Sequence, residues 1–281
     1  MTIGQLVQRV ARTGPAQRIV GRPPVVTFIA TLIQASTVRS SLRFVLRELS
    51  GDRRLGRYRL RRSPQSVFIR HGTADPSVLE EVFYSHHYEV PEHVALLLNG
   101  IERPPRLLDL GANIGLFGVW ALHRFPESEI TGFEPDPANA AVARLCIEAN
   151  AAGDRWRLIE AAATAENGKM PFVAGEFSRS RIEAGGRSEV EAVDVFPYLG
   201  SADLAKIDIE GGEWAILSDP RLRELGLTAL VLEYHPDQAP GVDPRALALD
   251  ALRAAGYEAR VVEKFGAGHG MLWAWRPDAV A

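Results

Sequence analysis

Two short segments in the second half of the chain bring acidic side chains and a histidine close together. They run Lys206–Glu213 (KIDIEGGE) and Glu233–Pro236 (EYHP). Alternate residues of an extended chain face the same side, so Asp208 and Glu210 can share one direction before the chain turns at the glycines. Burial or crowding raises the pKa of a carboxyl, and histidine titrates near neutrality. The pattern predicts a site that accepts a proton, with His235 as the first candidate for the base. The alternatives are Asp208, Glu210 and, from an earlier segment, His86 and His87.

The same set of side chains offers ligands that suit a divalent cation. Oxygen and nitrogen atoms come from Asp208, Glu210, Glu233 and His235, and a bound cation would lower the pKa of an acceptor hydroxyl. Their spacing is not diagnostic of a metal site. We therefore predict a site without a metal and keep a divalent ion as an alternative. Lys206 is interpreted as an ion-pair partner of its acidic neighbours.

A glycine-containing loop earlier in the chain predicts a ligand-binding turn. It runs Asp109–Gly115 (DLGANIG). Gly111 allows a tight turn close to a ligand, and Gly115 allows close contact where a helix begins. Asp109 can accept hydrogen bonds from an ammonium group of a ligand or from loop amides. Glu134 follows the next apolar run and can receive two ribose hydroxyls.

The spacing of the glycines separates two kinds of adenosine-bearing cofactor. A dinucleotide fingerprint has the form G-x-G-x-x-G, with its second glycine beside the pyrophosphate. Here the glycines stand at 111, 115 and 118, and Asn113 occupies that second position. The spacing D-x-G-x-x-x-G favours S-adenosylmethionine.

Strands that alternate with helices must position these residues. The apolar runs predict strands at Leu107–Leu110, Glu129–Phe133, Trp156–Ala162, Leu204–Ile209 and Ala229–Glu233, and a closing hairpin of Tyr257–Val262 and Met271–Trp275. Helices are predicted from Gly115 to about Phe125, from Pro137 to Asn150, and at about Glu213–Leu217 and Pro244–Ala255. This alternation predicts an α/β, Rossmann-like, doubly wound sheet of about seven strands with a terminal antiparallel hairpin. Ligands of such sheets bind outside the carboxyl ends of the strands.

Composition excludes several classes of protein. The chain has 281 residues and a net charge of −3, with 46% hydrophobic and 24% charged residues. Cys146 is its only cysteine, so no internal disulfide can form and a reducing, cytoplasmic setting is expected. No charge-free run reaches the roughly 20 residues of a membrane span. The overall charge argues against a dedicated nucleic-acid partner, and the sequence carries no signal for an oligomeric state.

Residues 1–60 are predicted to form a basic, mainly helical amino-terminal extension, and residues 61–281 the main domain. Residues 1–70 contain fourteen arginines and two acidic residues. The favoured interpretation is a helical cap that packs apolar side chains on the main domain. These are Leu6, Val7 and Val10, followed by Phe44, Val45 and Leu49. Contact with an anionic membrane surface or a partner, and an organellar targeting peptide, are the alternatives. Tyr58–Leu60 and Ser66–Ile69 predict a small hairpin.

Four segments resemble, in order and spacing, the successive motifs of the FkbM family of S-adenosylmethionine-dependent methyltransferases. They are Leu107–Gly115 (LLDLGANIG), Gly132–Pro137 (GFEPDP), Lys206–Gly211 (KIDIEG) and Val231–His235 (VLEYH). The resemblance extends from about Val67 to His235 and does not include the first 55 or so residues. His71 departs from it, because the family more often has proline there.

The resemblance implies O-methylation of a hydroxyl on a small molecule, sugar or polyketide-type acceptor, with S-adenosylhomocysteine as the product. It implies cofactor contacts, which we expect at Asp109, Gly111, Ala112, Asn113, Gly115, Glu134, Pro135, Ala162 and Asp208. Asp208 and Glu210 are expected at the reaction centre. An NAD-dependent oxidoreductase and a non-catalytic Rossmann-like binding protein are the alternatives.

Overall fold

The computed structural model describes residues 23–173, 181–182, 188–266 and 268–277. The chain divides into two compact units, residues 1–86 and residues 87–281. The predicted small hairpin therefore lies within the first unit. The division into an extension and a methyltransferase domain near residue 60 stays a prediction.

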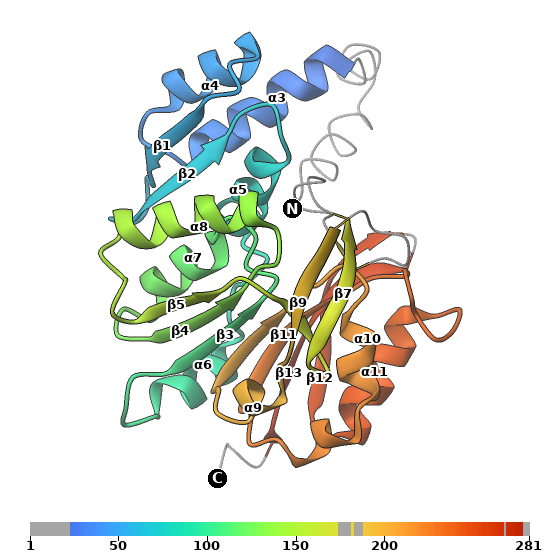
Figure 1. Cartoon of the computed structure of the whole chain (residues 1–281). Helices are drawn as coiled ribbons and strands as arrows, with labels where there is room; N and C mark the ends of the chain where they lie inside the picture. The colour runs from blue at the N-terminus through green and yellow to red at the C-terminus, as the bar shows by residue number, and fades with distance from the viewer. Residues whose placement is uncertain (1–22, 174–180, 183–187, 267, 278–281) are drawn as a thin grey trace, which may run out of the picture. The chain divides into compact units, whose positions relative to one another are not determined.

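In its described part, residues 23–86, the first unit combines three helices with a two-stranded sheet (Figure 1). Its elements are α3 (Pro23–Ser36), α4 (Ser41–Ser50), β1 (Leu55–Arg59), β2 (Ser66–Arg70) and α5 (Asp75–Phe83). The two strands are antiparallel, with Leu55 opposite Arg70 and Arg59 opposite Ser66, so the predicted hairpin is confirmed. Its inner face buries Tyr58, Val67 and Ile69.

The packing expected of the amino-terminal apolar residues is only partly observed. Phe44 is fully buried, whereas Leu49 is 50% exposed, so the expectation that Leu49 packs inward is wrong. Leu49 follows Phe44 by five positions, which places the two side chains on different faces of a helix. Leu6, Val7 and Val10 lie outside the described residues.

The second unit contains a seven-stranded sheet, which confirms the predicted fold. The strand order is β12-β13-β11-β10-β3-β4-β5. The bounds are β3 (Arg106–Leu110), β4 (Glu129–Phe133), β5 (Trp156–Ile159), β10 (Leu204–Ile207), β11 (Ala229–Tyr234), β12 (Glu258–Gly266) and β13 (His269–Trp275). Strands β3, β4, β5, β10 and β11 pair in parallel, and β13 is antiparallel to both β11 and β12. The strand order reverses between β3 and β10, where a ligand is expected to bind.

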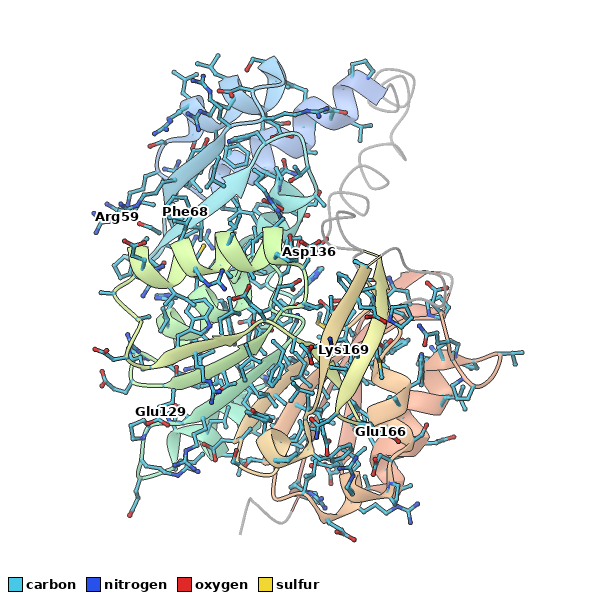
Figure 2. All side chains as sticks on the ribbon, viewed as in Figure 1. Arg59, Phe68, Glu129, Asp136, Glu166 and Lys169 are labelled. Atoms are coloured by element: carbon cyan, nitrogen blue, oxygen red, sulfur yellow. The ribbon has the colours of Figure 1, made fainter. Side chains whose placement is uncertain are left out.

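Helices lie between the strands of this sheet along the chain. They are α6 (Glu92–Asn99), α7 (Leu116–Arg124), α8 (Pro137–Ala149), α9 (Phe196–Leu199), α10 (Glu213–Ser218) and α11 (Pro244–Ala254), with a short 3₁₀ helix at Pro220–Glu224. Asp136 begins α8 by accepting a hydrogen bond from the Ala138 amide (Figure 2). One face of the sheet, which includes Leu110, Ile207 and Leu232, packs with residues of α9, α10 and α11. Asp109 and Lys206 alternate with these residues and therefore face the other side.

The third predicted strand, Trp156–Ala162, is wrong as a single element. Strand β5 ends at Ile159, and Ala162 begins β6 (Ala162–Thr164) of a second, four-stranded sheet. The other strands of that sheet are β7 (Gly168–Val173), β8 (Arg181–Ile182) and β9 (Ser188–Asp194). The chain changes pairing partner, because Ile159 pairs with Phe133 whereas Ala162 pairs with Ala192. The sequence analysis did not predict this sheet.

No helix in the described part of the chain combines the length and the hydrophobicity that crossing a membrane requires. Cys146 is buried in α8 as a free thiol.

Gly118 of α7 lies against the indole of Trp156, and this contact gives a test of the packing between α7 and the sheet. A Cβ at Gly118 would lie 2.0 Å from Trp156 Cζ2. We expect Gly118→Ala to destabilise the protein by about 1–3 kcal/mol in urea unfolding, because overpacking outweighs the gain of about 1 kcal/mol in helix propensity.

Gly153→Ala is the matched control, because a Cβ there has no atom within 4 Å. We expect this control to be neutral or to stabilise by up to about 1 kcal/mol. Equal stability of the two variants would contradict the packing described for Gly118.

Candidate active site

The loop after β3 is held against β4 by backbone hydrogen bonds. The amides of Gly111 and Ala112 both donate to the carbonyl of Phe133, at 3.1 and 2.7 Å. Gly111 has φ +83°, and a Cβ there would lie 1.9 Å from the carbonyl oxygen of Asp208. Glycine is therefore required for the tight turn, as predicted. The backbone after β10 also approaches this glycine closely, and the expected approach of a ligand stays a prediction.

Glu134 fixes the same loop from the end of β4. Its Oε2 accepts a hydrogen bond from the Asn113 amide at 2.7 Å, and its Oε1 accepts one from the Asp136 amide at 2.9 Å. Burial raises the pKa of Glu134 to about 7 despite these donors. The side chain of Asn113, which has φ +49°, leaves a buried Oδ1 with no hydrogen-bond partner among the described residues. A carboxylate has about four acceptor positions, and Asn139 Nδ2 occupies a third one with a long hydrogen bond of 3.4 Å to Oε1. Glu134 therefore keeps capacity for one further donor, or for two where a ligand replaces Asn139.

Lys206 joins the loop to the end of β10. Its ammonium donates to the Gly111 carbonyl at 2.7 Å and lies 3.2 Å from Asp208 Oδ2 and 3.5 Å from Asp109 Oδ1. Asp109 is fully buried, and neither of its carboxylate oxygens has a hydrogen-bond partner among the described residues. Burial raises the pKa of Asp109. The interpretation of Lys206 as an ion-pair partner is confirmed, and its pKa is held above the ordinary value because Asp208 and Asp109 outweigh the effect of burial.

A cluster of carboxylates and histidines lies at the carboxyl ends of β10 and β11. Glu213, fully buried at the start of α10, organises it. Glu213 Oε1 accepts the His235 amide at 2.7 Å and lies 3.1 Å from His235 Nδ1, while Oε2 accepts the Gly211 amide at 2.8 Å. Trp214 Nε1 donates to the His235 carbonyl at 3.0 Å. These contacts tie the turn after β10 to the end of β11.

The surroundings of His235 favour its protonated form. Burial alone would lower its pKa, but the hydrogen bond to Glu213 and the nearby charge of Asp208 raise that pKa to about 10. His235 Nε2 lies 3.6 Å from Glu210 Oε2. A histidine that already holds both protons cannot accept another near neutral pH, so the structure disfavours His235 as the base.

The carboxylates of the cluster differ in their tendency to ionise. Burial and the charge of Asp208 raise the pKa of Glu210 to about 7, and the same two causes raise the pKa of Glu233. For Asp208, burial opposes ionisation, but Lys206 and His235 lower the pKa. Glu210 has φ +52°, a conformation that non-glycine residues rarely adopt. Glu210 is therefore the group in this cluster best suited to exchange a proton near pH 7.

The structure brings together most of the side chains expected at the site. Asp109, Gly111, Asn113 and Glu134 surround one loop, and Asp208, Glu210 and His235 adjoin it through Lys206. Ala112 is buried in the loop, Gly115 ends it with φ +83°, Pro135 follows Glu134, and Ala162 begins β6. The roles of all these residues stay predictions.

Sequence reasoning missed two members of the cluster. Glu213 belongs to a quoted motif but was given no role, because its contact with His235 depends on how α10 returns to β11. His269 has its Nε2 at 2.6 Å from Glu233 Oε1. The closing hairpin brings it there, since Met271 of β13 pairs with Glu233 of β11.

Two overlapping sets of side chains have the composition of metal ligands. They are Glu233, His235 and His269, and Asp208, Glu210 and His235, with ligand atoms within 4.8 Å of one another in each set. The rings of His235 and His269 are stacked, with centroids 4.5 Å apart and planes at 27°. Stacked rings direct their nitrogen lone pairs nearly parallel, which disfavours one ion shared by both. A site without a metal stays a prediction.

Comparisons with known proteins identify relatives for this region. A family model described as "Methyltransferase FkbM domain" matches residues 109–259, more than half of the chain. A curated relative, "Methyltransferase sdnD" of Sordaria araneosa, is 25% identical over 95 residues, and the match covers 34% of each chain. The chain therefore spans about a third of the length of that relative.

Solved structures of lower identity are also similar. One is a SAM-dependent methyltransferase from Agrobacterium tumefaciens, with a TM-score of 0.45 and 16% identity, covering 79% of this chain and 70% of that one. Another is precorrin-6y C5,15-methyltransferase from Geobacter metallireducens, with a TM-score of 0.41 and 18% identity, covering 65% of this chain and 86% of that one.

The buried ion pair predicts that removing Lys206 strongly lowers the stability of the protein. We expect Lys206→Met to lower the free energy of unfolding by about 3–5 kcal/mol in urea titrations, because Asp109 is left buried without a cation. The loss should grow as pH rises above 4, since a carboxyl with a raised pKa in the folded state destabilises that state when it ionises.

Two further variants control for this effect. The double variant Asp109→Asn/Lys206→Met should recover part of the stability and show a weaker pH dependence, because only Asp208 is then left without the lysine. Lys169→Met removes an exposed lysine that lies 3.5 Å from Glu191, and should change stability by less than about 1 kcal/mol. A loss below about 1 kcal/mol for Lys206→Met would contradict the role given to Lys206.

Proposed function

The chain belongs to the FkbM methyltransferase family, and from that premise we propose that it transfers a methyl group from S-adenosylmethionine to a hydroxyl oxygen. The proposed acceptor is a small molecule, a sugar or a polyketide-type product, and S-adenosylhomocysteine is the other product. We place the reaction in the cytoplasm, in keeping with the free thiol of Cys146.

The observation that carries this proposal is the bridge made by Lys206. Its ammonium contacts the Gly111 carbonyl of the loop and the Asp208 carboxylate of the acidic cluster, at 2.7 and 3.2 Å. A group that binds along the loop therefore lies next to side chains that can accept a proton. This is the arrangement that methyl transfer to a hydroxyl requires, because the reacting atoms must be held together and a proton must leave.

The residues present fit S-adenosylmethionine. Glu134 has one free acceptor position for a sugar hydroxyl, and a second hydroxyl can replace the long bond from Asn139. The buried Oδ1 of Asn113 is an acceptor with no hydrogen-bond partner among the described residues. We propose further contacts from Asp109, Gly111, Ala112, Gly115, Pro135, Ala162 and Asp208. When bound, the cofactor supplies a methyl group that its sulfonium already activates.

Glu210 is the proposed general base, and His235 is a positioning residue. An aliphatic hydroxyl is a weak nucleophile, so a base must take its proton as the new bond forms. A carboxyl with a pKa of about 7 is ionised in a substantial fraction of molecules at neutral pH. Protonated His235, held by Glu213, keeps a positive charge 3.6 Å from Glu210 Oε2 and so favours its ionised form.

Glu134 provides the first test of this proposal, by isothermal titration with S-adenosylmethionine and with NAD. We expect S-adenosylmethionine to bind more tightly, and Glu134→Gln to weaken it by about 10- to 100-fold, since two charge-assisted hydrogen bonds are lost. In the wild type, affinity should rise with pH through about 7, because only the ionised carboxylate accepts both hydroxyls.

Glu129→Gln is the control, because Glu129 begins β4 at the opposite end and its side chain is 61% exposed. It should leave the affinity unchanged. Tighter binding of NAD would favour the oxidoreductase alternative. Binding with no release of S-adenosylhomocysteine in the presence of any sugar or polyketide-type alcohol would favour the non-catalytic one.

Glu210 provides the second test, once screening for S-adenosylhomocysteine release has found an acceptor. We expect Glu210→Gln to lower kcat by about 10²- to 10⁴-fold, with little change in cofactor affinity. The wild-type kcat should rise with pH through about 7, as the base loses its proton. His235→Gln should move this rise to higher pH, because the positive charge beside Glu210 is lost.

The opposite pattern would restore His235 as the base. In that case His235→Gln would abolish the pH-dependent rise in kcat, and Glu210→Gln would leave it in place.

A further inference from the structure

We propose that one face of α4, formed by Leu42, Leu46 and Leu49, docks the protein on an anionic lipid surface together with the arginines of the same unit. This inference concerns residues outside the proposed active site, and its test does not depend on methyl transfer.

The three leucines form an exposed apolar stripe. Leu42 is 73% exposed, Leu46 is 61% exposed and Leu49 is 50% exposed. They stand at positions i, i+4 and i+7 of one helix, a spacing that aligns side chains along one face. Exposed leucines occur singly on most proteins, but three in line on a ten-residue helix make a continuous ridge.

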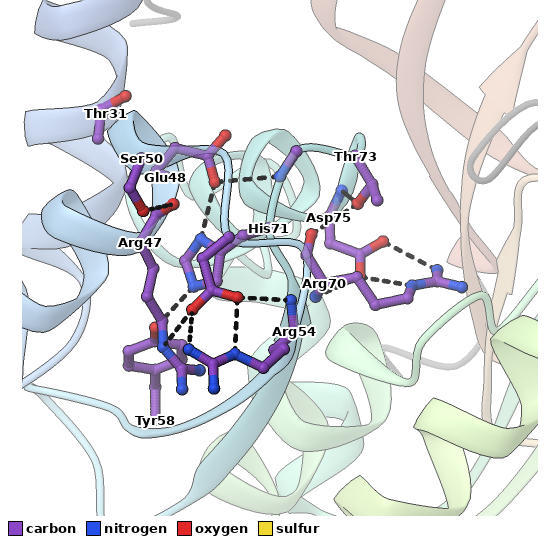
Figure 3. A network of polar contacts seen from close by, with 12 residues as sticks. Thr31, Arg47, Glu48, Ser50, Arg54, Tyr58, Arg70, His71, Thr73 and Asp75 are labelled. Carbon is purple, nitrogen blue, oxygen red and sulfur yellow. Dashed lines mark hydrogen bonds and ion pairs between the residues drawn. The ribbon is translucent and has the colours of Figure 1, made fainter.

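The opposite face of α4 is fixed to the hairpin, so the stripe cannot rotate inward. Glu48 Oε2 lies 2.7 Å from His71 Nδ1, and His71 Nε2 lies 2.6 Å from the Tyr58 hydroxyl, as Figure 3 shows. Phe44 packs against the rings of Tyr58 and His71, with centroids 5.2 and 4.9 Å away. Rotating α4 to bury its leucines would break these contacts and expose Phe44.

The surface of this unit is strongly basic. Residues 39–70 contain ten arginines and two acidic residues. The two acids are engaged, since Glu48 contacts His71 and Asp52 pairs with Arg54 at 2.9 Å. Exposed arginines are Arg39, Arg43, Arg53, Arg54, Arg57, Arg59, Arg61 and Arg62. Residues 1–22 add four more arginines and no acid.

The basic surface of this unit and the small area of the leucine stripe together favour a lipid surface over a protein partner. A short helix with an apolar ridge and neighbouring arginines has the composition of segments that insert at the headgroup level of anionic membranes. A stable protein interface buries about 800 Å² on each partner, far more than three leucines on a helix about 15 Å long provide. Anionic headgroups complement the arginines, and the leucines provide the apolar insertion.

Vesicle co-sedimentation of the full chain tests the proposal. The vesicles contain either phosphatidylcholine alone or three parts phosphatidylcholine to one part phosphatidylglycerol, at about 0.1 M salt. We expect binding to the anionic vesicles only, and weakening by added salt. Leu42→Gln/Leu46→Gln should reduce the partition coefficient at least about tenfold, because two apolar side chains are lost from the contact.

Leu96→Gln is the matched control, because Leu96 is 68% exposed on α6 of the other unit. It should bind vesicles like the wild type. A second test uses Arg43→Ser, which removes an exposed arginine of α4 next to Leu42, and should weaken binding about fivefold. Circular dichroism melting confirms that each variant is folded.

Three results would overturn the proposal. One is equal binding of the wild type and the folded leucine variant, and another is equal binding of the wild type to neutral and anionic vesicles. The third is a wild-type dimer that the leucine variant converts to a monomer without any change in vesicle binding, since a second copy of the chain would then cover this face.

Discussion

The buried ammonium of Lys206 is the interaction on which the arrangement of the site depends. It lies on the central strand β10 and meets three acceptors, the Gly111 carbonyl and the carboxylates of Asp208 and Asp109. Two of these acceptors come from β3 and the loop after it, so one charge holds two neighbouring strand ends together. A carboxylate buried as deeply as Asp109 requires such a partner, and the partner is also what sets the position of the loop.

Neighbouring positive charges determine which carboxylates of the acidic cluster can ionise. Asp208, Glu210, Glu213 and Glu233 converge at the ends of two strands, and crowded carboxylates cannot all ionise unless cations accompany them. Lys206 provides one cation, and His235 provides another when it is protonated. In our proposal, His235 balances the charge of these carboxylates by keeping its proton. That task conflicts with taking a proton from an acceptor, and for this reason the proposed base is Glu210.

The sequence predicted the sheet and the place of the site better than the roles of individual side chains. Strands such as Leu107–Leu110 and Ala229–Glu233 were recognisable because they are apolar, short and separated by helices. The second sheet was missed although Ser188–Asp194 alternates charged and apolar residues, a pattern that itself indicates a half-buried strand. The protonation of His235 could not be predicted from the sequence for a different reason. Its pKa depends on Glu213, a residue 22 positions away that only the return of β11 past α10 brings into contact.

The conformation of the turn after β10 and the pKa of Glu210 both depend on Glu213. A residue with φ +52° stores backbone strain of about 1–3 kcal/mol unless it is glycine, so other contacts must hold it in place. Glu213 provides them by accepting the Gly211 amide with one oxygen and by holding His235 with the other. The same carboxylate therefore maintains the strained turn and, through His235, the charge that tunes the pKa of Glu210. A change at Glu213 must therefore alter both the direction of the Glu210 side chain and its pKa. The conformation of this turn and the acid–base chemistry of Glu210 depend on the same carboxylate.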